Sequence, residues 1–534
     1  MSTLAKPTAP LNEVSPLRLR FLALLLLLTL VAGWLRFSGT SFGLPGLFRP
    51  DEEYMLNPAM GFVNDWNPHF SIYPAAQMYV QHFALIVYAR VHGEKDDFRQ
   101  FYGGDNYPTA HLVARGASAT LGAATVPAIY YAVAPVFGVP AGLAAAAMVT
   151  FSSMHVLNSK FATTDVGAVF WLTLAIAMIV RIANYGRWRD YIFAGIFSGL
   201  ATATKYPAGA IVFGVAAAHL GNCWRSRGLW RAFVNPRIYL AAALTLVAFF
   251  FGTPYTLLDW SQTLRDYGYQ RNFVVNGYSA AGYGWRWLFL RTMPDCFGFA
   301  MCILLMLGML WAFMGRRGGL SLLAFISATF IALIRSHQLF YRYILIPFPA
   351  MVVLAAILVA DLFELASIQL GPKIGRAVAI VCFALVLAPS LVRDLQLGQL
   401  LQKTDTRIMA RQWMMDHVTP GSAIAEVDDT TMYGKPPLRD IYRVEPFDDP
   451  TILRKKNVFW VVSDSYPALF YSRGPLPKEA VELNSEATLV FDIDPLVYGG
   501  PQPVFDINDA FYAPLQHISG VARPGPRIRI WKLK

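Results

Sequence analysis

The sequence predicts an α-helical protein that crosses a membrane many times and ends in a small soluble α/β domain. Two observations lead to this fold class. Only 15% of the 534 residues are charged and 55% are apolar, whereas a soluble globular protein has ~25% charged residues. The apolar residues also come in uncharged blocks, such as 22–35 and 301–314, and not at amphipathic spacing. A soluble core this large would need many more polar residues to cover it.

The apolar blocks predict about eleven membrane spans. A spanning helix needs ~20 mostly apolar residues, and glycine and proline are tolerated inside it. The first block has no clear cleavage site after it, so we expect an uncleaved span and not a signal peptide. The predicted spans are 20–37, 111–134, 138–157, 163–182, 190–204, 206–221, 238–258, 286–313, 319–334, 343–363 and 377–393.

Lysine and arginine orient these spans. If the N-terminus is cytoplasmic, the short basic loops 181–189, 225–237, 316–317 and 373–376 all lie inside, as the positive-inside rule requires. The same loops explain the net charge of +11. No basic stripe interleaved with exposed aromatic residues is present, so we expect no nucleic-acid partner.

Three regions then face outward: 38–110, 259–285 and everything after about 394. Within the first, the stretch 74–90 is apolar with a few polar residues, which favours a helix lying in the membrane interface. We therefore divide the chain into a transmembrane domain, 1–393, whose first outer loop is 38–110, and an outer domain, 394–534.

The outer domain differs from the membrane part because its apolar runs are only as long as β-strands. An amphipathic helix is expected at 406–417. Polar, proline and glycine turns separate the runs, which predicts a small α/β domain. The predicted strands are 422–427, 457–463, 487–493 and 527–533.

Four scattered cysteines form no CxxC pair, which argues against a zinc cluster or a redox motif. Three of them lie in or near apolar segments, where cysteine behaves as a small buried hydrophobe.

Charged residues near a bilayer are costly and are often functional. Asp51 and Glu52 begin an acidic run after the first span, which is either a solvated loop start or a general base held over the membrane. Arg115 lies about one turn inside the second span, where it either snorkels to the surface or pairs with the acidic run. Asp165 is either a helix N-cap or a ligand at the outer surface.

Several basic residues are predicted on the outer side, against the positive-inside trend. Lys205, His337 and Arg342 lie at outward span ends, as does Arg335. They either anchor the chain in the interface or bind a lipid phosphate. A base for an acceptor and cations for a phosphate leaving group on one side of the membrane suit transfer of a group from a lipid phosphate.

The order of these motifs resembles the GT-C glycosyltransferases of the protein O-mannosyltransferase type, family 39-like, which include the aminoarabinose-to-lipid-A transferases. The resemblance covers roughly residues 15–420, and nothing comparable is identified beyond about 430. The matching pieces are Asp51-Glu52, 67–74 (NPHFSIYP, with Tyr73), 115–122 (RGASATLG), His155 followed by 159–165 (SKFATTD), 199–206 (GLATATKY), Arg342-Tyr343 with Pro347 and Pro349, and 404–413.

The resemblance implies a polyprenyl-phosphate-linked sugar donor in the outer leaflet, Asp51 as catalytic base, and inversion of the anomeric centre. Glu52 would then stabilise charge on the sugar, Arg342 and Lys205 would stabilise the leaving phosphate, and Arg115 would pair with Glu52. Tyr73, Arg115, Asp165 and His337 are further candidate substrate-binding residues. The aromatic loop 267–287 would line the sugar and lipid groove.

A divalent metal is left open. Asp51, Asp165, His155 and His337 could supply ligands, but none of them forms a metal-site spacing such as HxxxH, so no metal site is assigned.

The sequence does not specify the sugar or the acceptor, and it allows two other functions. Mannose or another sugar would be moved to a protein, lipid or glycan hydroxyl, and membrane lipids would surround the chain. A short basic N-terminus without long insertions favours a bacterial inner membrane. The alternatives are a transporter or flippase for a lipid-linked sugar, and a GT-C-like membrane assembly protein without activity.

Overall fold

A computed structural model describes most of the chain. The described residues are 16–94, 101–228, 230–276, 284–314, 318–337, 339–427, 434–465, 483, 485–506 and 513–534. Two features expected from the sequence lie partly or wholly outside this set: the basic pair 316–317, and residues 277–283 of the aromatic loop.

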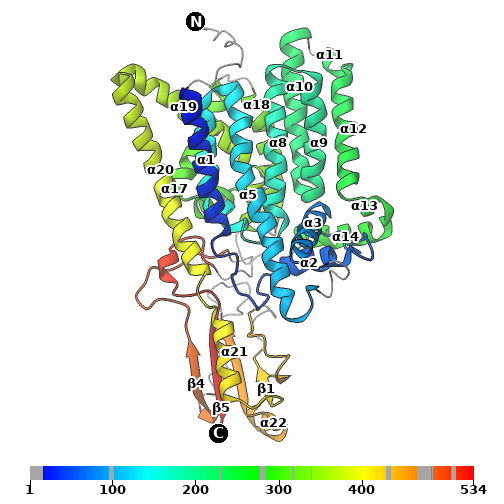
Figure 1. Ribbon diagram of the computed structural model, residues 1–534, viewed down its shortest axis with the longest axis vertical. Helices are drawn as coiled ribbons and strands as arrows, with labels where there is room; N and C mark the ends of the chain where they lie inside the picture. Colours follow the sequence, from blue (N-terminus) through cyan, green and yellow to red (C-terminus); the bar gives the residue numbers. More distant parts are fainter. Residues whose placement is uncertain are drawn as a thin grey trace.

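The upper part of the molecule is a bundle of long helices, and the C-terminal domain projects from one end of it (Figure 1). Among the described residues, five helical stretches are long and apolar enough to cross a membrane: Leu19–Phe37 of α1 (Pro16–Phe37), α5 (Tyr107–Phe137), α8 (Thr164–Asn184), α19 (Phe348–Leu370), and Pro372–His417, which holds α20 (Pro372–Leu401) and α21 (Thr406–His417). Shorter apolar helices accompany them: α6 (Val139–Thr150), α12 (Pro236–Gly252), α17 (Phe299–Trp311) with its extension to Met314, and α18 (Gly319–Arg335).

Every one of the predicted spans falls on helical structure. The bundle is completed by helices that are shorter, more polar or both. They are α2 (Pro50–Gly61), α3 (Ala76–Val91), α7 (Ser153–Asn158), α9 (Trp188–Thr204), α10 (Ile211–Arg227), α11 (Trp230–Phe233), α13 (Tyr255–Leu258), α14 (Trp260–Asn276), α15 (Trp285–Trp287) and α16 (Met293–Phe297).

Small residues allow the helices to approach closely, as expected where lipid replaces water. Gly195 and Gly199 lie one turn apart on α9 and face α12. A Cβ atom would lie 2.5 Å from the Ala241 carbonyl oxygen at Gly195, and 2.4 Å from the Thr245 carbonyl oxygen at Gly199. This contact fixes α9, which ends at Thr204, directly before Lys205.

Helices α2, α3, α13 and α14 form a layer at the end of the bundle nearest the C-terminal domain (Figure 1). The stretch 74–90 is helical as predicted, but its polar residues face protein. Gln81 Nε2 donates to the Ala162 carbonyl oxygen at 3.0 Å, and His82 Nδ1 lies 2.7 Å from the Ala59 carbonyl oxygen. Its exposed side instead carries apolar residues such as Phe83 and Val87.

The C-terminal domain is a five-stranded sheet with the order β2-β1-β3-β5-β4. The strands are β1 (Ala423–Glu426), β2 (Arg443–Pro446), β3 (Trp460–Ser465), β4 (Ala487–Ile493) and β5 (Arg527–Leu533), and a short helix, α22 (Pro450–Lys455), precedes β3. Strand β1 is parallel to β2 and β3, whereas β5 is antiparallel to β3 and β4.

All four predicted strands are present, and among the described residues of this domain β2 is the strand that was missed. Its four residues, Arg443–Pro446, include two charges and a proline and therefore carry no apolar run. The amphipathic helix α21 was predicted correctly, and its Ala410 and Met414 pack on Ile528 of the sheet. Helix α20 runs unbroken through the proposed domain boundary at 393/394.

Candidate functional site

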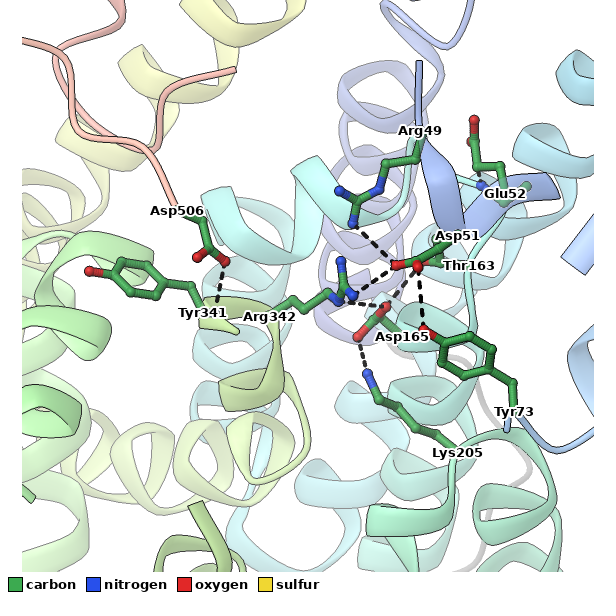
Figure 2. Close-up of polar contacts among 11 residues, drawn as sticks. Arg49, Asp51, Glu52, Tyr73, Thr163, Asp165, Lys205, Tyr341, Arg342 and Asp506 are labelled. Atoms are coloured by element: carbon green, nitrogen blue, oxygen red, sulfur yellow. Dashed lines mark hydrogen bonds and ion pairs between the residues drawn. The ribbon is translucent and has the colours of Figure 1, made fainter. Parts of the chain in front are cut away.

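The ends of four segments converge beside the outer layer of helices. Asp51 lies in the first turn of α2 and Asp165 in the first turn of α8, where the helix dipole favours a negative charge. Lys205 directly follows α9, and Arg342 lies in a short 3₁₀ turn, Tyr341–Leu345. Figure 2 shows the four charged side chains pointing toward one another.

Asp51 is the most accessible carboxylate of this group, with 22% of its side chain exposed. Its Oδ2 lies 2.7 Å from Nη2 of Arg342 and 3.9 Å from Nη2 of Arg49. The Tyr73 hydroxyl donates to its Oδ1 at 3.3 Å. Burial, and then the nearby Asp51 carboxylate, raise the pKa of Tyr73 well above its usual value, so the phenol keeps its proton and remains a donor.

Asp165 is buried and contacts two cations of the cluster, Lys205 and Arg342. Lys205 Nζ donates to Asp165 Oδ1, and Nε of Arg342 lies 4.0 Å from Oδ2. Thr163 also donates to Oδ2, at 3.1 Å. Arg342 therefore stands between two carboxylates, and Asp165 holds both cations in place.

Three cations and two carboxylates form the cluster: Lys205, Arg342 and Arg49 with Asp51 and Asp165. Arg49 is fully buried and stacks over the Phe161 ring at 5.0 Å from its centre. Guanidinium and ammonium groups gathered in this way are suited to bind a phosphate or carboxylate beside the cluster.

A cavity of about 590 Å³ opens onto the cluster. Its charged lining residues are Asp51, Asp165, Lys205 and Arg342. The rest of the wall is largely apolar and aromatic, and includes Trp260, Leu264 and Tyr267 of α14, Leu333 and Tyr206. A cavity of this size, with a few convergent polar groups in an apolar wall, is typical of a site for a small organic ligand.

Glu52 points away from this cavity into a second, fully buried ion pair. Arg115 donates to its two oxygens through Nε at 2.8 Å and Nη2 at 2.6 Å, and the Ala162 amide donates at 2.9 Å. Burial alone would raise the pKa of Glu52, but the Arg115 guanidinium outweighs it and holds the pKa below its ordinary value. Nη1 of Arg115 also donates to the Thr40 and Phe42 carbonyl oxygens, so one arginine ties α5 to two segments of the first outer loop.

The predicted site residues therefore separate into groups. Asp51, Tyr73, Asp165, Lys205 and Arg342 line the cavity. Glu52 and Arg115 pair with each other behind it, and do not line it.

The histidines expected near the site lie elsewhere. His337 is exposed and does not line the cavity, although its neighbour Ser336 does. His155 is buried against Arg36, whose Nη2 lies 2.8 Å from its Nδ1. Among the described residues, no three histidine, cysteine or acidic side chains are grouped as a metal site would need.

Sequence reasoning missed Arg49. The signal was available, because this arginine lies two residues before Asp51 in an outward loop where basic residues are unexpected. Asp51 and Arg49 meet because the extended residue Arg49 and the following Pro50 start α2, which turns both side chains to one side.

Comparison with known proteins gives one sequence match and a set of structural matches. Residues 93–257 match the family described as dolichyl-phosphate-mannose-protein mannosyltransferase. This segment contains Arg115, Asp165 and Lys205. No curated protein matches the chain by sequence.

Three solved structures share the fold. An oligosaccharyltransferase from Archaeoglobus fulgidus, tethered to an acceptor peptide, has a TM-score of 0.50 and 15% identity over 83% of this chain and 69% of its own. AglB from Archaeoglobus fulgidus, in complex with an inhibitory peptide and a dolichol-phosphate, has a TM-score of 0.51 and 14% identity over 89% of this chain and 73% of its own. ArnT from Cupriavidus metallidurans in the apo state has a TM-score of 0.50 and 15% identity over 96% of this chain and 97% of its own.

These likenesses confirm the fold class that the sequence predicted, a helical polytopic membrane protein of GT-C type with a C-terminal sheet domain. The resemblance to the GT-C glycosyltransferases is confirmed with it.

Proposed function

We propose that this chain, an integral membrane protein related to the GT-C glycosyltransferases, transfers a sugar from a polyprenyl-phosphate donor to an acceptor hydroxyl. One observation carries the proposal. A single cavity brings an accessible carboxylate, Asp51, within 2.7 Å of an arginine that can bind phosphate, Arg342, under an aromatic and apolar wall. Acceptor activation and leaving-group stabilisation are the two tasks that such a transfer requires.

The cations of the cluster would bind the phosphate of the donor. A sugar linked to a polyprenyl monophosphate is a phosphodiester with one negative charge, and guanidinium and ammonium groups such as those of Arg342 and Lys205 bind such a group well. Arg342 and Lys205 line the cavity and would contact the phosphate, while Arg49 would act from behind Asp51. Trp260 and Tyr267 offer ring faces that suit a sugar or the first prenyl units.

The transfer itself is a single displacement. Asp51 takes the proton of the acceptor hydroxyl while that oxygen forms a bond to the anomeric carbon. The bond from that carbon to the phosphate oxygen breaks, and its electron pair stays with the polyprenyl phosphate. Asp51 is then neutral and returns its proton to solvent, and the anomeric centre is inverted. Asp51 suits the base better than Asp165, which is buried and held by Lys205.

Glu52 and Arg115 receive a structural role in this proposal, in place of contact with the sugar. Their buried pair fixes the start of α2 against α5, and this fixes the backbone that carries Asp51. Mannose is one candidate sugar. Protein, lipid and glycan hydroxyls are the candidate acceptors.

The orientation follows from the basic loops. We propose that the cavity and the C-terminal domain face the outside of a bacterial inner membrane, because the loops 181–189 and 373–376 would then lie in the cytoplasm.

The test is a transfer assay with purified protein, a panel of radiolabelled polyprenyl-phosphate sugars, and native membrane extract as acceptor. Wild type is compared with Asp51→Asn. Asp65→Asn is a matched control, because Asp65 is an exposed carboxylate of the same outer loop that pairs with His69. We expect label to move with wild type and Asp65→Asn only.

Two outcomes would contradict the proposal. Near-wild-type turnover by Asp51→Asn would remove Asp51 as the base. Absence of transfer, together with movement of the lipid-linked sugar between the leaflets of proteoliposomes, would identify a transporter instead.

A further inference from the structure

A segment of the C-terminal domain reaches back onto the membrane bundle behind the cation cluster. Asp506 follows Phe505 in this segment, and only 6% of it is exposed. Its Oδ2 accepts a hydrogen bond from the backbone amide of Tyr341 at 2.9 Å. Figure 2 shows Asp506 at the end of an irregular segment that comes down beside Tyr341, the residue directly before Arg342.

The same turn is held a second time by the C-terminal domain. The Tyr341 hydroxyl donates to Asp295 Oδ2 at 3.2 Å, and Gln516 Nε2 donates to Asp295 Oδ1 at 2.8 Å. Tyr341 itself is buried. Both the backbone and the side chain of the residue before Arg342 are therefore linked to residues of the C-terminal domain.

These contacts bear on the direction of the Arg342 side chain. Arg342 lies in a turn of only five residues, Tyr341–Leu345, and such a short turn has few internal hydrogen bonds to hold it. An amide that donates to a buried carboxylate is a strong, charge-assisted contact. Fixing the Tyr341 amide fixes the peptide plane that starts Arg342, whose guanidinium must lie between Asp51 and Asp165.

Asp506 also lies near the second arginine of the cluster. A small cavity of about 20 Å³ is lined by both Arg49 and Asp506, together with Asn158 and Leu515. This is enough room for one water molecule, which needs ~10–15 Å³. The carboxylate thus stands behind both arginines that flank Asp51.

We infer that Asp506 is a positioning residue through which the C-terminal domain sets Arg342 for the donor phosphate. This inference rests on the proposed function, because it assigns Arg342 to that phosphate. It gives the C-terminal domain a part in forming the phosphate-binding side of the site. Asp506 does not line the large cavity, so it acts through Tyr341 and Arg342 and not on the substrate.

The first experiment measures binding of undecaprenyl phosphate to the full-length protein in nanodiscs. Asp506→Ala removes the acceptor for the Tyr341 amide, and we expect the Kd to rise about tenfold or more, as for loss of a hydrogen bond to a charged group. Asp506→Asn keeps an acceptor oxygen and should stay within about threefold of wild type. Asp492→Ala is the matched control, since it breaks a carboxylate–arginine pair with Arg527 elsewhere in the same domain.

A double-mutant cycle separates positioning from general damage. In an Arg342→Ala background, Asp506→Ala should add less than about a twofold loss, because the residue that it positions is gone. An equal loss in both backgrounds would overturn the inference, and so would an Asp506→Asn protein as weak as Asp506→Ala.

A second readout needs neither ligand nor activity. Amide hydrogen exchange of the peptide 339–343 should speed up in Asp506→Ala, and not in Asp506→Asn or Asp492→Ala. If wild type binds no undecaprenyl phosphate and transfers no sugar, the proposed function fails, while exchange still decides whether Asp506 holds this turn. Unchanged exchange in Asp506→Ala would overturn the inference whatever the activity of the chain.

Discussion

The buried ion pair between Arg115 and Glu52 gives the sharpest test of how the first outer loop is held. We consider Arg115→Ala. The substitution removes two charge-assisted hydrogen bonds to Glu52, at 2.8 and 2.6 Å, and two more to the Thr40 and Phe42 carbonyl oxygens. It leaves the Glu52 carboxylate buried, with the Ala162 amide as a hydrogen-bond donor and His111 Nδ1 3.9 Å away.

The magnitude follows from the burial of both partners, whose side chains are 1% and 2% exposed. Removing one partner of such a pair costs about 3–5 kcal/mol, because the other charge stays in a medium of low dielectric. We therefore expect the free energy of unfolding of Arg115→Ala to fall by about this amount. Transfer should fall with it, since the pair holds the turn that carries Asp51.

The assay is reversible unfolding by SDS in mixed micelles, with helix content as the signal. Lys456→Ala is the matched control, because Lys456 and Asp448 form an ion pair whose side chains are 46% and 42% exposed. Such a surface pair contributes about 0–1 kcal/mol. The double substitution Glu52→Leu with Arg115→Met removes both charges at similar volume, and should recover at least half of the loss.

If Arg115→Ala loses no more stability than Lys456→Ala, the buried pair does not hold this loop. If the double substitution is as unstable as Arg115→Ala, the unpaired charge of Glu52 is not the cause of the loss.

Four further predictions concern the site, its pH response and the topology. Arg342→Ala should raise the Kd for undecaprenyl phosphate roughly 10- to 100-fold, as for loss of a contact to a charged group, and an unchanged Kd would assign this arginine to structure alone. Tyr73→Phe should lower kcat roughly 2- to 10-fold through loss of its hydrogen bond to Asp51, with little change in donor Kd. The pKa of Glu52 is depressed in the folded state, so its pairing stabilises the protein fully above its ordinary pKa of 4.5, and SDS unfolding should show that contribution disappearing as the pH falls below that value. Single cysteines placed in a cysteine-free background should be labelled from outside at positions 60 and 450 and only from inside at position 226. Labelling of position 226 from outside would overturn the orientation.

The sequence singled out several charged residues of the candidate site because membrane-embedded charge is rare and costly. Lys205 and Arg342 were chosen because they are basic residues predicted at outward span ends, against the positive-inside trend. The pairing of Arg115 with the acidic run was considered because an arginine one turn inside a span needs a partner. The family resemblance implied that this partner is Glu52, and the structure confirms it.

Other parts of the site carried no local signal. Arg49 was overlooked although it is a basic residue in an outward loop, and nothing in its local sequence shows that it is buried or that it approaches Asp51. Asp506 was missed because it lies in an irregular segment of the C-terminal domain, where an acidic residue predicts only solvent exposure.

The sequence by itself determined the membrane class, the helical segments and four of the five strands, because each depends on local composition and on the period of apolar residues. Tertiary structure decided which charges meet. Neighbouring carboxylates, Asp51 and Glu52, point in opposite directions from one helical turn, one to the cavity and one to Arg115. Packing of the C-terminal domain on the bundle also brings Asp506 to the turn that carries Arg342. Contacts between these residues depend on how segments that are distant in the sequence pack together, and the local spacing of apolar residues carries no information about that packing.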